Sequence, residues 1–445
     1  MQLVAMGAQD VYLTGNPQIT FFKVVYRRHT NFSKECIAQT FSGSIPETGT
    51  GSVTCTLARN GDLVQEIYLK ATLNASNDTN EQTVTLLSST NVFTVSSTAS
   101  LPTGANVSFD IDISTTDDGV VIHKDRRYVV VNIDGTTFSL TDNGVAVIWT
   151  TGAAGFTTGA KVSVESVAID KDITDLIKTV EVEIGGQKID KHYSQWLDIY
   201  NELFETSHDY RNAMSLGTPG NNKTVYIPLR FWFNRNPGLA LPLIALQYHE
   251  VKVLMDLNVP ANSTMGDAKL LVNYLYLDTD ERRRFAQVSH EYLIEQVQHT
   301  GVESDSTIDM NFNHPVKALF WTQPSATLGV AKLQLNGHDR AAEQPHDYYH
   351  LVQPYECGLG HSGKSLNTSA RTWGPVVNTG ANNNVGMYSF CLKPAEHQPS
   401  GTCNFSRIDN ARLNLDGAST GVYLFAMNYN VLRIMSGMGG LAYSN

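Results

Sequence analysis

The sequence predicts an all-β protein built from two similar units in tandem, each large enough for an eight-stranded sandwich or jelly roll. Composition is the first reason: of 445 residues only 17% are charged and 34 are Gly, which suits many short strands joined by turns. The second reason is a set of segments that recur along the chain. The third is that apolar residues mostly alternate or form short runs, with little helical spacing.

The recurrence is clearest at two turns. Gly185-Gly186 in "VEVEIGGQKIDKH" and Asn336-Gly337 in "AKLQLNGHDR" both suit a two-residue hairpin, and Gly186 and Gly337 lie 151 residues apart. "VNYLYL" (272–277) is echoed by "MNYNVL" (427–432) at an offset of 155. "YHEVKVLMDL" (248–257) has a looser counterpart in "IDNARLNLDG" (408–417) at about 160. Three pairs of similar segments, which we call anchors, occur in the same order and predict a duplicated domain.

The first unit contains an extra segment. "VQEI" (64–67) aligns with "VKAL" (316–319) at an offset of 252, which is 101 more than the hairpins give. About a hundred additional residues therefore lie between Ile67 and Gly185. Residues 74–165 are rich in Thr, Ser, Val and Asp-Gly turns and include strand-like pieces such as "YVVVNI" and "TTFSL". An inserted small β-domain is the prediction, and a disordered linker is the alternative.

Helical spacing occurs in two places. "YSQWLDIYNELF" (193–204) puts its large apolar residues on one face, and a second helix is expected to begin in "DERRRFAQVSHEYLIEQV" (280–297), where the two units join. The rest of the chain is expected to form strands and turns.

Charge and cysteine usage exclude several classes of protein. A net charge of -11 argues against binding of nucleic acid or of an anionic membrane through a broad positively charged surface. The five cysteines are scattered without a C-x-x-C pair, so we expect reduced, mostly buried thiols and neither a zinc site nor a disulfide framework: Cys36, Cys55, Cys357, Cys391 and Cys403. Without a signal-peptide pattern or a long apolar stretch, a soluble, non-secreted protein is expected.

"GLGHSGKS" (358–365) fits the phosphate-loop pattern G-x-x-x-x-G-K-[ST]. A phosphate loop needs a buried strand before it and a helix after it, but Pro354 precedes it and Pro375 follows it without helical spacing. Asp278 is the one candidate for a magnesium-binding Asp, and it belongs to the first unit. We predict a flexible loop of the second unit. An NTPase is the weaker alternative, which Lys364→Ala would decide by its effect on nucleotide binding.

Other candidate sites are weaker still. His346 and His350 are spaced like metal ligands on a helix, but the general-base Glu is absent and the surroundings look strand-like, so a surface or interface pair is predicted. No G-x-S-x-G elbow occurs. The run Arg282 to Arg284 could touch nucleic acid, yet acidic residues precede it and local charge pairing is the simpler interpretation. We therefore assign no catalytic, cofactor-binding or metal-binding residue.

Seven long blocks carry a resemblance to a known family. They are "GAQDVYLTGNPQITFFKVVYRRHTNFS" (7–33), "RNGDLV" (59–64), "IGGQKIDKHYSQWL" (184–197), "NPGLALPLIALQYHEVK" (236–252), "DERRRFAQVSHEYLIEQV" (280–297), "QPSGTCNFSRIDNA" (398–411) and "NYNVLRIMSGMGGLAYSN" (428–445). In these blocks, which span the chain, the sequence resembles the major capsid proteins of nucleocytoplasmic large DNA viruses, most of all the algal-virus (phycodnavirus) type.

The resemblance implies a structural protein of the virion with a double jelly roll fold, without enzyme activity or cofactors. It implies homotrimers that form pseudo-hexagonal capsomers and tile an icosahedral capsid above an internal membrane, which the chain does not span. Partners would be the chain itself and minor capsid and penton proteins, with no direct contact to nucleic acid. Assembly would take place in the host cell cytoplasm.

Three parts follow from this resemblance together with the repeat. Residues 1–25 would form an N-terminal arm on the inner side, 26–282 a first jelly roll interrupted at about 75–165, and 283–445 a second jelly roll. The insertion is longer than the corresponding loop of the family and is weakly similar to small β-modules of phage virion proteins. We expect it to be surface-exposed, facing glycans or the host, and its deletion to leave trimers intact.

Glycans are a further partner that the sequence leaves open. Eight N-x-[ST] sequons begin at Asn31, Asn74, Asn77, Asn106, Asn222, Asn262, Asn367 and Asn404. The resemblance implies that viral enzymes can attach sugars, at these or other positions. A carbohydrate-binding module is the remaining alternative function, since β-sandwiches often have that role.

Overall fold

The computed structural model describes most of the two predicted units and the strands of the insertion. The described residues are 14–24, 26, 28–75, 82–87, 92–96, 106–109, 113–114, 121–122, 128–133, 135–142, 145–147, 161–164, 176–204, 222–259, 263–323, 328–340, 343–359, 385–416 and 421–443.

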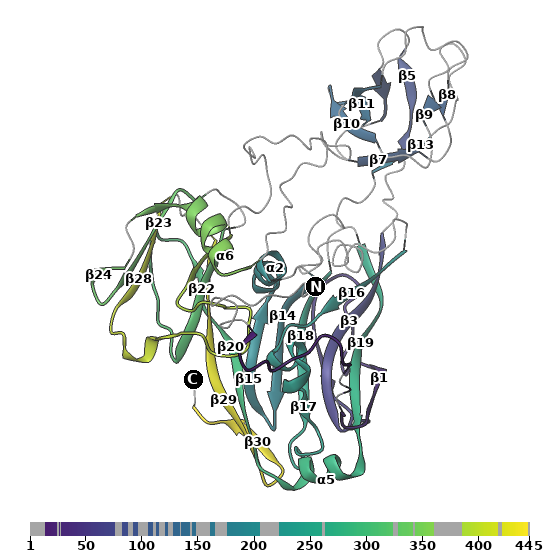
Figure 1. The fold of residues 1–445 in the computed structure, drawn as a ribbon. Helices are drawn as coiled ribbons and strands as arrows, with labels where there is room; N and C mark the ends of the chain where they lie inside the picture. The colour runs from purple at the N-terminus through teal and green to yellow at the C-terminus, as the bar shows by residue number, and fades with distance from the viewer. Residues whose placement is uncertain are drawn as a thin grey trace, which may run out of the picture.

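Two antiparallel sheets form what we call the first sandwich (Figure 1). One sheet has the order β1 (Phe32–Gln39), β19 (Ser263–Leu277), β3 (Leu63–Ala75), β16 (Asn222–Pro228), with β17 (Leu241–Pro242) beside β3. The other has the order β15 (Gln187–Tyr193), β14 (Ile177–Ile184), β18 (Val251–Val259), β2 (Gly49–Thr56). In β18 every second residue is buried, and the apolar faces of both sheets share one core.

The second sandwich repeats the order of the four main strands in each sheet and adds short strands at the edges. Its first sheet has the order β20 (His290–Glu303), β29 (Val422–Met435), β22 (Pro315–Thr322), β26 (Val385–Ser389), with β27 (Cys403–Asn404) beside β22 and β30 (Met438–Leu441) beside β29. Its other sheet has the order β21 (Thr307–Asp309), β28 (Ala411–Leu415), β23 (Val330–Leu335), β24 (His338–Asp339), with β25 (Gln344–Pro345) also on β23. The predicted duplication of an eight-stranded jelly roll is confirmed.

The sequence anchors fall on equivalent strands. The two hairpin turns have the expected positive φ angles, 59° and 85° at Gly185 and Gly186 and 52° and 74° at Asn336 and Gly337. The anchors "VQEI" and "VKAL" lie in β3 and β22. One anchor is displaced by a residue: Ile67 pairs with Val272, and its counterpart Leu319 pairs with Ala426, so β19 and β29 are related by 154 residues and not 155.

The insertion forms a sheet of its own between β3 and β14. Its order is β4 (Gln82–Thr83), β13 (Lys161–Val164), β7 (Asn106–Phe109), β10 (Tyr128–Asn132), β11 (Thr137–Asp142), β6 (Val92–Thr94), β5 (Thr85–Leu87), with β12 (Val145–Ala146) beside β11 and a separate pair β8 (Ile113–Ser114) and β9 (Val121–Ile122). A separate core that includes Phe93 and Phe138, stacked at 5.4 Å, holds it together. Figure 1 shows this sheet beyond one end of the sandwiches.

Helices are short and lie between strands. They are α2 (Ser194–Leu203), α4 (Trp232–Arg235), η3 (Pro237–Leu239), α5 (Thr279–Gln287), the π-helical η4 (Tyr348–Val352), α6 (Gln353–Glu356) and η5 (Phe405–Arg407). Both predicted helices are present, and α5 joins the sandwiches. The Asp278 carboxylate caps α5 by accepting from the Thr279 amide at 2.8 Å. Within the described ranges, no helix is long and apolar enough to cross a membrane.

Candidate functional site

The surface where the first sandwich meets the second, which we call the seam, is the most elaborate site in the described chain. Helix α2 bridges it, following directly on β15. Leu197 points into the core of the first sandwich, whereas Trp196, Ile199 and Leu203 pack against the outer face of the second. The residues that receive them come from all four strands of one sheet: Val297, Ala318, Phe320, Val385, Met387, Phe425 and Met427.

Trp196 forms the centre of this contact. Its ring lies 5.4 Å from Phe320 and 5.8 Å from Phe425, and all three side chains are fully buried. Each aromatic ring of this size removes a large apolar area from water, and edge-to-face contacts add to that gain. The predicted amphipathic face of 193–204 therefore serves to join the two sandwiches.

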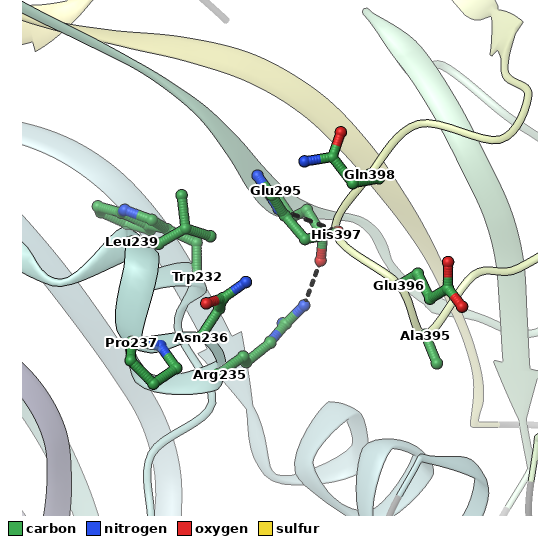
Figure 2. Close-up of a pocket in the computed structure, with 10 residues that line it drawn as sticks. All are labelled: Trp232, Arg235, Asn236, Pro237, Leu239, Glu295, Ala395, Glu396, His397 and Gln398. Atoms are coloured by element: carbon green, nitrogen blue, oxygen red, sulfur yellow. Dashed lines mark hydrogen bonds and ion pairs between the residues drawn. The ribbon is translucent and has the colours of Figure 1, made fainter. Parts of the chain in front are cut away.

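A charged cluster lies beside the apolar contact. Glu295 of β20 accepts from Arg235 of α4, with Nη1 to Oε2 at 2.6 Å, and from Lys317 of β22, with Nζ to Oε1 at 2.6 Å. Figure 2 shows Arg235 reaching from the first sandwich toward Glu295 in the second. Lys317 also donates to the Glu396 carbonyl at 2.9 Å and lies 5.1 Å from the Tyr429 ring centroid. The Lys317 side chain is completely buried.

The electrostatics of the cluster keep Glu295 ionised. Burial alone would raise the pKa of Glu295, but the His397 imidazole, 3.8 Å away, and the charges of Arg235 and Lys317 outweigh burial and lower the pKa to about 2. Two cations around one buried carboxylate form a network that is satisfied only while both sandwiches are in place.

A pocket of about 390 Å³ opens next to the cluster. Residues of both sandwiches line it (Figure 2): Trp232, Arg235, Asn236, Pro237, Leu239, Glu295, Ala395, Glu396, His397 and Gln398. Arg235 is held in place by its own Nε, which donates to the Arg230 carbonyl at 2.7 Å, and by the Tyr200 ring at 4.9 Å. Arg235, Glu295 and His397 of the pocket already engage one another, so its walls fix the relative position of the two sandwiches.

Hydrogen bonds extend the seam along β15 and β20. The buried Asp190 carboxylate accepts from the Val297 amide at 3.1 Å, and the Gln296 side chain donates to the Ile189 carbonyl. Asn430 of β29 donates to Gln296 at 2.9 Å, which connects a third strand. The Asp190 and Gln296 side chains thus hold β15 of the first sandwich and β20 of the second in one fixed alignment.

The C-terminal hairpin of β29 and β30 closes the far end of the seam. The Tyr248 amide donates to the Gly437 carbonyl at 3.0 Å, and the Gly439 amide donates to Nδ1 of His249 at 3.2 Å. A Cβ built on Gly437 would lie 2.6 Å from the Tyr248 ring, so glycine is needed for this approach. The last strand of the second sandwich is therefore fitted to a loop of the first.

Comparison with known proteins identifies the family. The family described as "Major capsid protein N-terminus" matches residues 20–118 and 154–278, and the family "Large eukaryotic DNA virus major capsid protein" matches 281–329 and 322–440. The chain belongs to the major capsid proteins of large eukaryotic DNA viruses. The major capsid protein of Pyramimonas orientalis virus is 46% identical over 100% of this chain and 99% of its own, and that of Paramecium bursaria Chlorella virus 1 is 36% identical over the same shares.

Solved structures agree on the architecture of this capsid protein. A quasi-atomic model of the PBCV-1 virus capsid matches with a TM-score of 0.64 and 32% identity over 96% of this chain and all of the other. The Faustovirus major capsid protein matches with a TM-score of 0.61 at 12% identity, over 97% and 94% of the two chains, a likeness of fold. The chain is a component of the virion capsid with a double jelly roll fold.

The structure describes some of the candidate site residues of this capsid protein and not others. The phosphate-loop match begins at Gly358, after α6, and its residues 360–365, with Lys364, lie outside the described residues. Asp278 caps α5. Arg282 pairs at 3.0 Å with Asp62, a residue distant in the sequence and not one of the acidic residues that precede the Arg run. Among the residues that the structure describes, no three His, Cys, Asp or Glu side chains are grouped as a metal site would require.

Two expectations about single side chains are wrong. His346 and His350 are buried, not on the surface, and they lie in a helical run at 346–356 and not in strand-like surroundings. Their rings stack at 6.2 Å, and Nδ1 of His350 is 2.7 Å from the Val385 carbonyl. The thiols are free, but only Cys55 and Cys391 are buried, and Cys36 is exposed.

Sequence reasoning missed the charged cluster of the seam. A signal was present, because Lys317 stands inside the apolar run "PVKALFWT" and Glu295 inside "YLIEQV". Charges inside buried strands are rarely tolerated unless they are paired. Their partner Arg235 carries no such signal, since it lies in the short helix α4 between strands and not inside an apolar run.

Proposed function

We propose that three copies of this major capsid protein form a pseudo-hexagonal capsomer, which tiles an icosahedral shell. The supporting observation is that both sandwiches have the same strand order and the same hairpin turns. Three chains around one axis then present six similar units, so a threefold object fits a hexagonal lattice. The large buried seam fixes the two sandwiches of one chain as neighbouring units of that ring.

The partners follow from the same proposal. The chain associates with itself in trimers and between capsomers, and minor capsid and penton proteins bind the shell, with an internal membrane nearby. The net charge of -11 supports the absence of direct contact with nucleic acid. Glycans attached by viral enzymes, assembly in the host cytoplasm and the absence of catalytic activity complete the proposal.

The three-part organisation is proposed in the form that the sequence predicted. Residues 1–25 are an arm, 26–282 a first jelly roll interrupted at about 75–165, and 283–445 a second. The separate core of the inserted sheet and its place beyond one end of the sandwiches (Figure 1) support a module that projects from the shell toward glycans or the host. The match to the N-terminal family ends at residue 278 and the match to the second family begins at 281, close to the proposed boundary at 282.

Light scattering after size exclusion tests the trimer. Purified chain at micromolar concentration should elute with three times the chain mass of 48.9 kDa. A stable monomer at that concentration would contradict the proposal. Negative-stain images of the same fraction should show objects with six similar lobes.

A further inference from the structure

Helix α2 has a counterpart in the second sandwich. The helical run 346–356 follows β25 as α2 follows β15, and β26 comes next along the chain at the place of β16. Each helix places one buried apolar side chain in the core of its own sandwich, Leu197 in the first and Tyr349 in the second. The Tyr349 hydroxyl also donates to the Ala331 carbonyl at 3.1 Å. Aligning Leu197 with Tyr349 relates the two helices by 152 residues.

This alignment gives each of the three fully buried seam residues of α2 an apolar counterpart, whereas the half-buried Phe204 corresponds to Glu356. Trp196, Ile199 and Leu203 correspond to Tyr348, Leu351 and Tyr355. The first three are buried against the other sandwich. Tyr348 is half-buried and packs against the core of its own sandwich, but Leu351 is 52% and Tyr355 84% exposed. The second helix thus presents the apolar pattern of the first without the surface that covers it.

The outer face of the second sandwich, which covers α2, also has an equivalent in the first sandwich. Strand pairing places Tyr68 of β3 where Phe320 lies in β22. Tyr68 is flanked by Leu271 on one side and Pro228 on the other. In the same way, Phe320 is flanked by Phe425 and Met387 at the seam. Tyr68, Leu271 and Pro228 are half-buried on the outer face of the first sandwich.

We infer that the helix 346–356 of one copy docks on this outer face of a second copy, and so repeats between chains the contact that α2 makes within a chain. The inference rests on the proposed trimer. Around the ring, three contacts within chains would alternate with three contacts between chains. The occupant is another copy because the surface that fits this helix pattern is present on the chain itself, in the same fold context.

The composition of the two outer faces fits this assignment. Where the second sandwich has Ala318, Met427 and Val297, the first has Glu66, Asn273 and Cys36 at the paired positions. A face that is covered during folding can be wholly apolar. A face that stays in water until assembly needs polar groups around its apolar centre, which is the usual composition of an interface between separately folded partners.

Cys36 makes the docking measurable. It is an exposed free thiol at the position of Val297, which the α2 contact buries in the second sandwich. Maleimide labelling of the native protein, with peptide mapping, should modify Cys36 about tenfold more slowly in the trimer than in a monomeric variant. Cys55, buried inside the sandwich, should remain unlabelled in both and serves as the internal control.

The monomeric variant is Leu351→Asp with Tyr355→Asp. Both side chains are exposed in the single chain, so the variant should keep its near-UV circular dichroism while the trimer is lost at micromolar concentration, because buried carboxylates oppose docking. Ile133→Asp is the matched control: it replaces a 55% exposed aliphatic residue of the inserted sheet and should leave the trimer intact.

The outcomes separate this inference from the trimer itself. If the wild-type chain is trimeric but the double variant stays trimeric, or Cys36 in the trimer is labelled as fast as in unfolded protein, the inference is overturned and the trimer stands. If the wild-type chain is monomeric, the proposed function and the inference both fall.

Discussion

Equivalent strands of the two sandwiches are each joined by a Lys–Glu ion pair, with the charges exchanged between the strands and the surroundings different. In the first, Lys34 of β1 pairs with Glu66 of β3 at 2.7 Å, with side chains 43% and 33% exposed. In the second, Glu295 of β20 pairs with Lys317 of β22 at 2.6 Å, with side chains 6% and 0% exposed. Equivalent strands are thus joined by a Lys–Glu pair in both, but only the second pair is covered by the other sandwich.

The difference shows that the environment, and not the fold, sets the importance of a charge. An exposed pair is weakened by water and salt, and it contributes little to stability. The buried pair has lost its water, so each charge depends on its partners, and Arg235 of the other sandwich is one of them. Removing the carboxylate from each pair should therefore have unequal effects.

The largest effect is expected for Glu295→Gln. This change leaves Lys317 and Arg235 buried without a counter-ion, which should lower the free energy of unfolding by about 3–5 kcal/mol. Urea denaturation monitored by tryptophan fluorescence measures this, since Trp196 and Trp232 lie at or near the seam. Glu66→Gln in the monomeric Leu351→Asp, Tyr355→Asp background, where this pair stays exposed, is the matched control and should cost below about 1 kcal/mol. Equal losses in both variants would show that the seam does not isolate Glu295 from water.

Acid should remove the contribution of Glu295 to the free energy of unfolding. The folded pKa of Glu295, about 2, is below its ordinary value of 4.5, so its contribution to stability is complete above pH 4.5 and is lost as the pH falls toward 2. The wild-type chain should lose of the order of 3 kcal/mol more than Glu295→Gln over that window. Denaturation midpoints measured at intervals from pH 5 to pH 2.5 test this. Parallel curves for both proteins would mean that Glu295 titrates normally.

The sequence predicted the repeat but not the seam, for a physical reason. Strand alternation and the turns at Gly185 and Asn336 are local properties, and local properties suffice to predict the jelly rolls. The amphipathic face of 193–204 was also visible, but its partner surface lies more than a hundred residues away at Phe320 and Phe425. Which surface covers an apolar face depends on how two separate units approach each other, and neither composition nor periodicity contains that information.

A smaller contrast is expected at the two hairpin turns. Gly185 and Gly337 both have positive φ angles, so Ala at either position should cost about 1 kcal/mol in backbone strain. A Cβ on Gly185 would also lie 2.3 Å from the His249 ring, whereas one on Gly337 meets no atom within 4 Å. Because His249 binds Gly439 of the C-terminal hairpin, Gly185→Ala should cost about 2–3 kcal/mol in total. Thermal unfolding of the two variants compares them, and equal melting temperatures would show that His249 moves aside freely.

The smallest effect on assembly is expected for removal of the inserted sheet. The second sandwich connects the equivalent strands over a short stretch, from Thr322 to Val330, so the jelly roll itself does not need the long path from Ala75 to Ile177. Replacing residues 76–165 by a short Gly-Ser linker should leave the melting temperature of the sandwiches and the trimer mass, less the deleted residues, unchanged. Ala75 is kept because it pairs with Ser263. A chain that fails to fold after this deletion would show that the insertion supports the first jelly roll, and the separate core around Phe93 argues against that outcome.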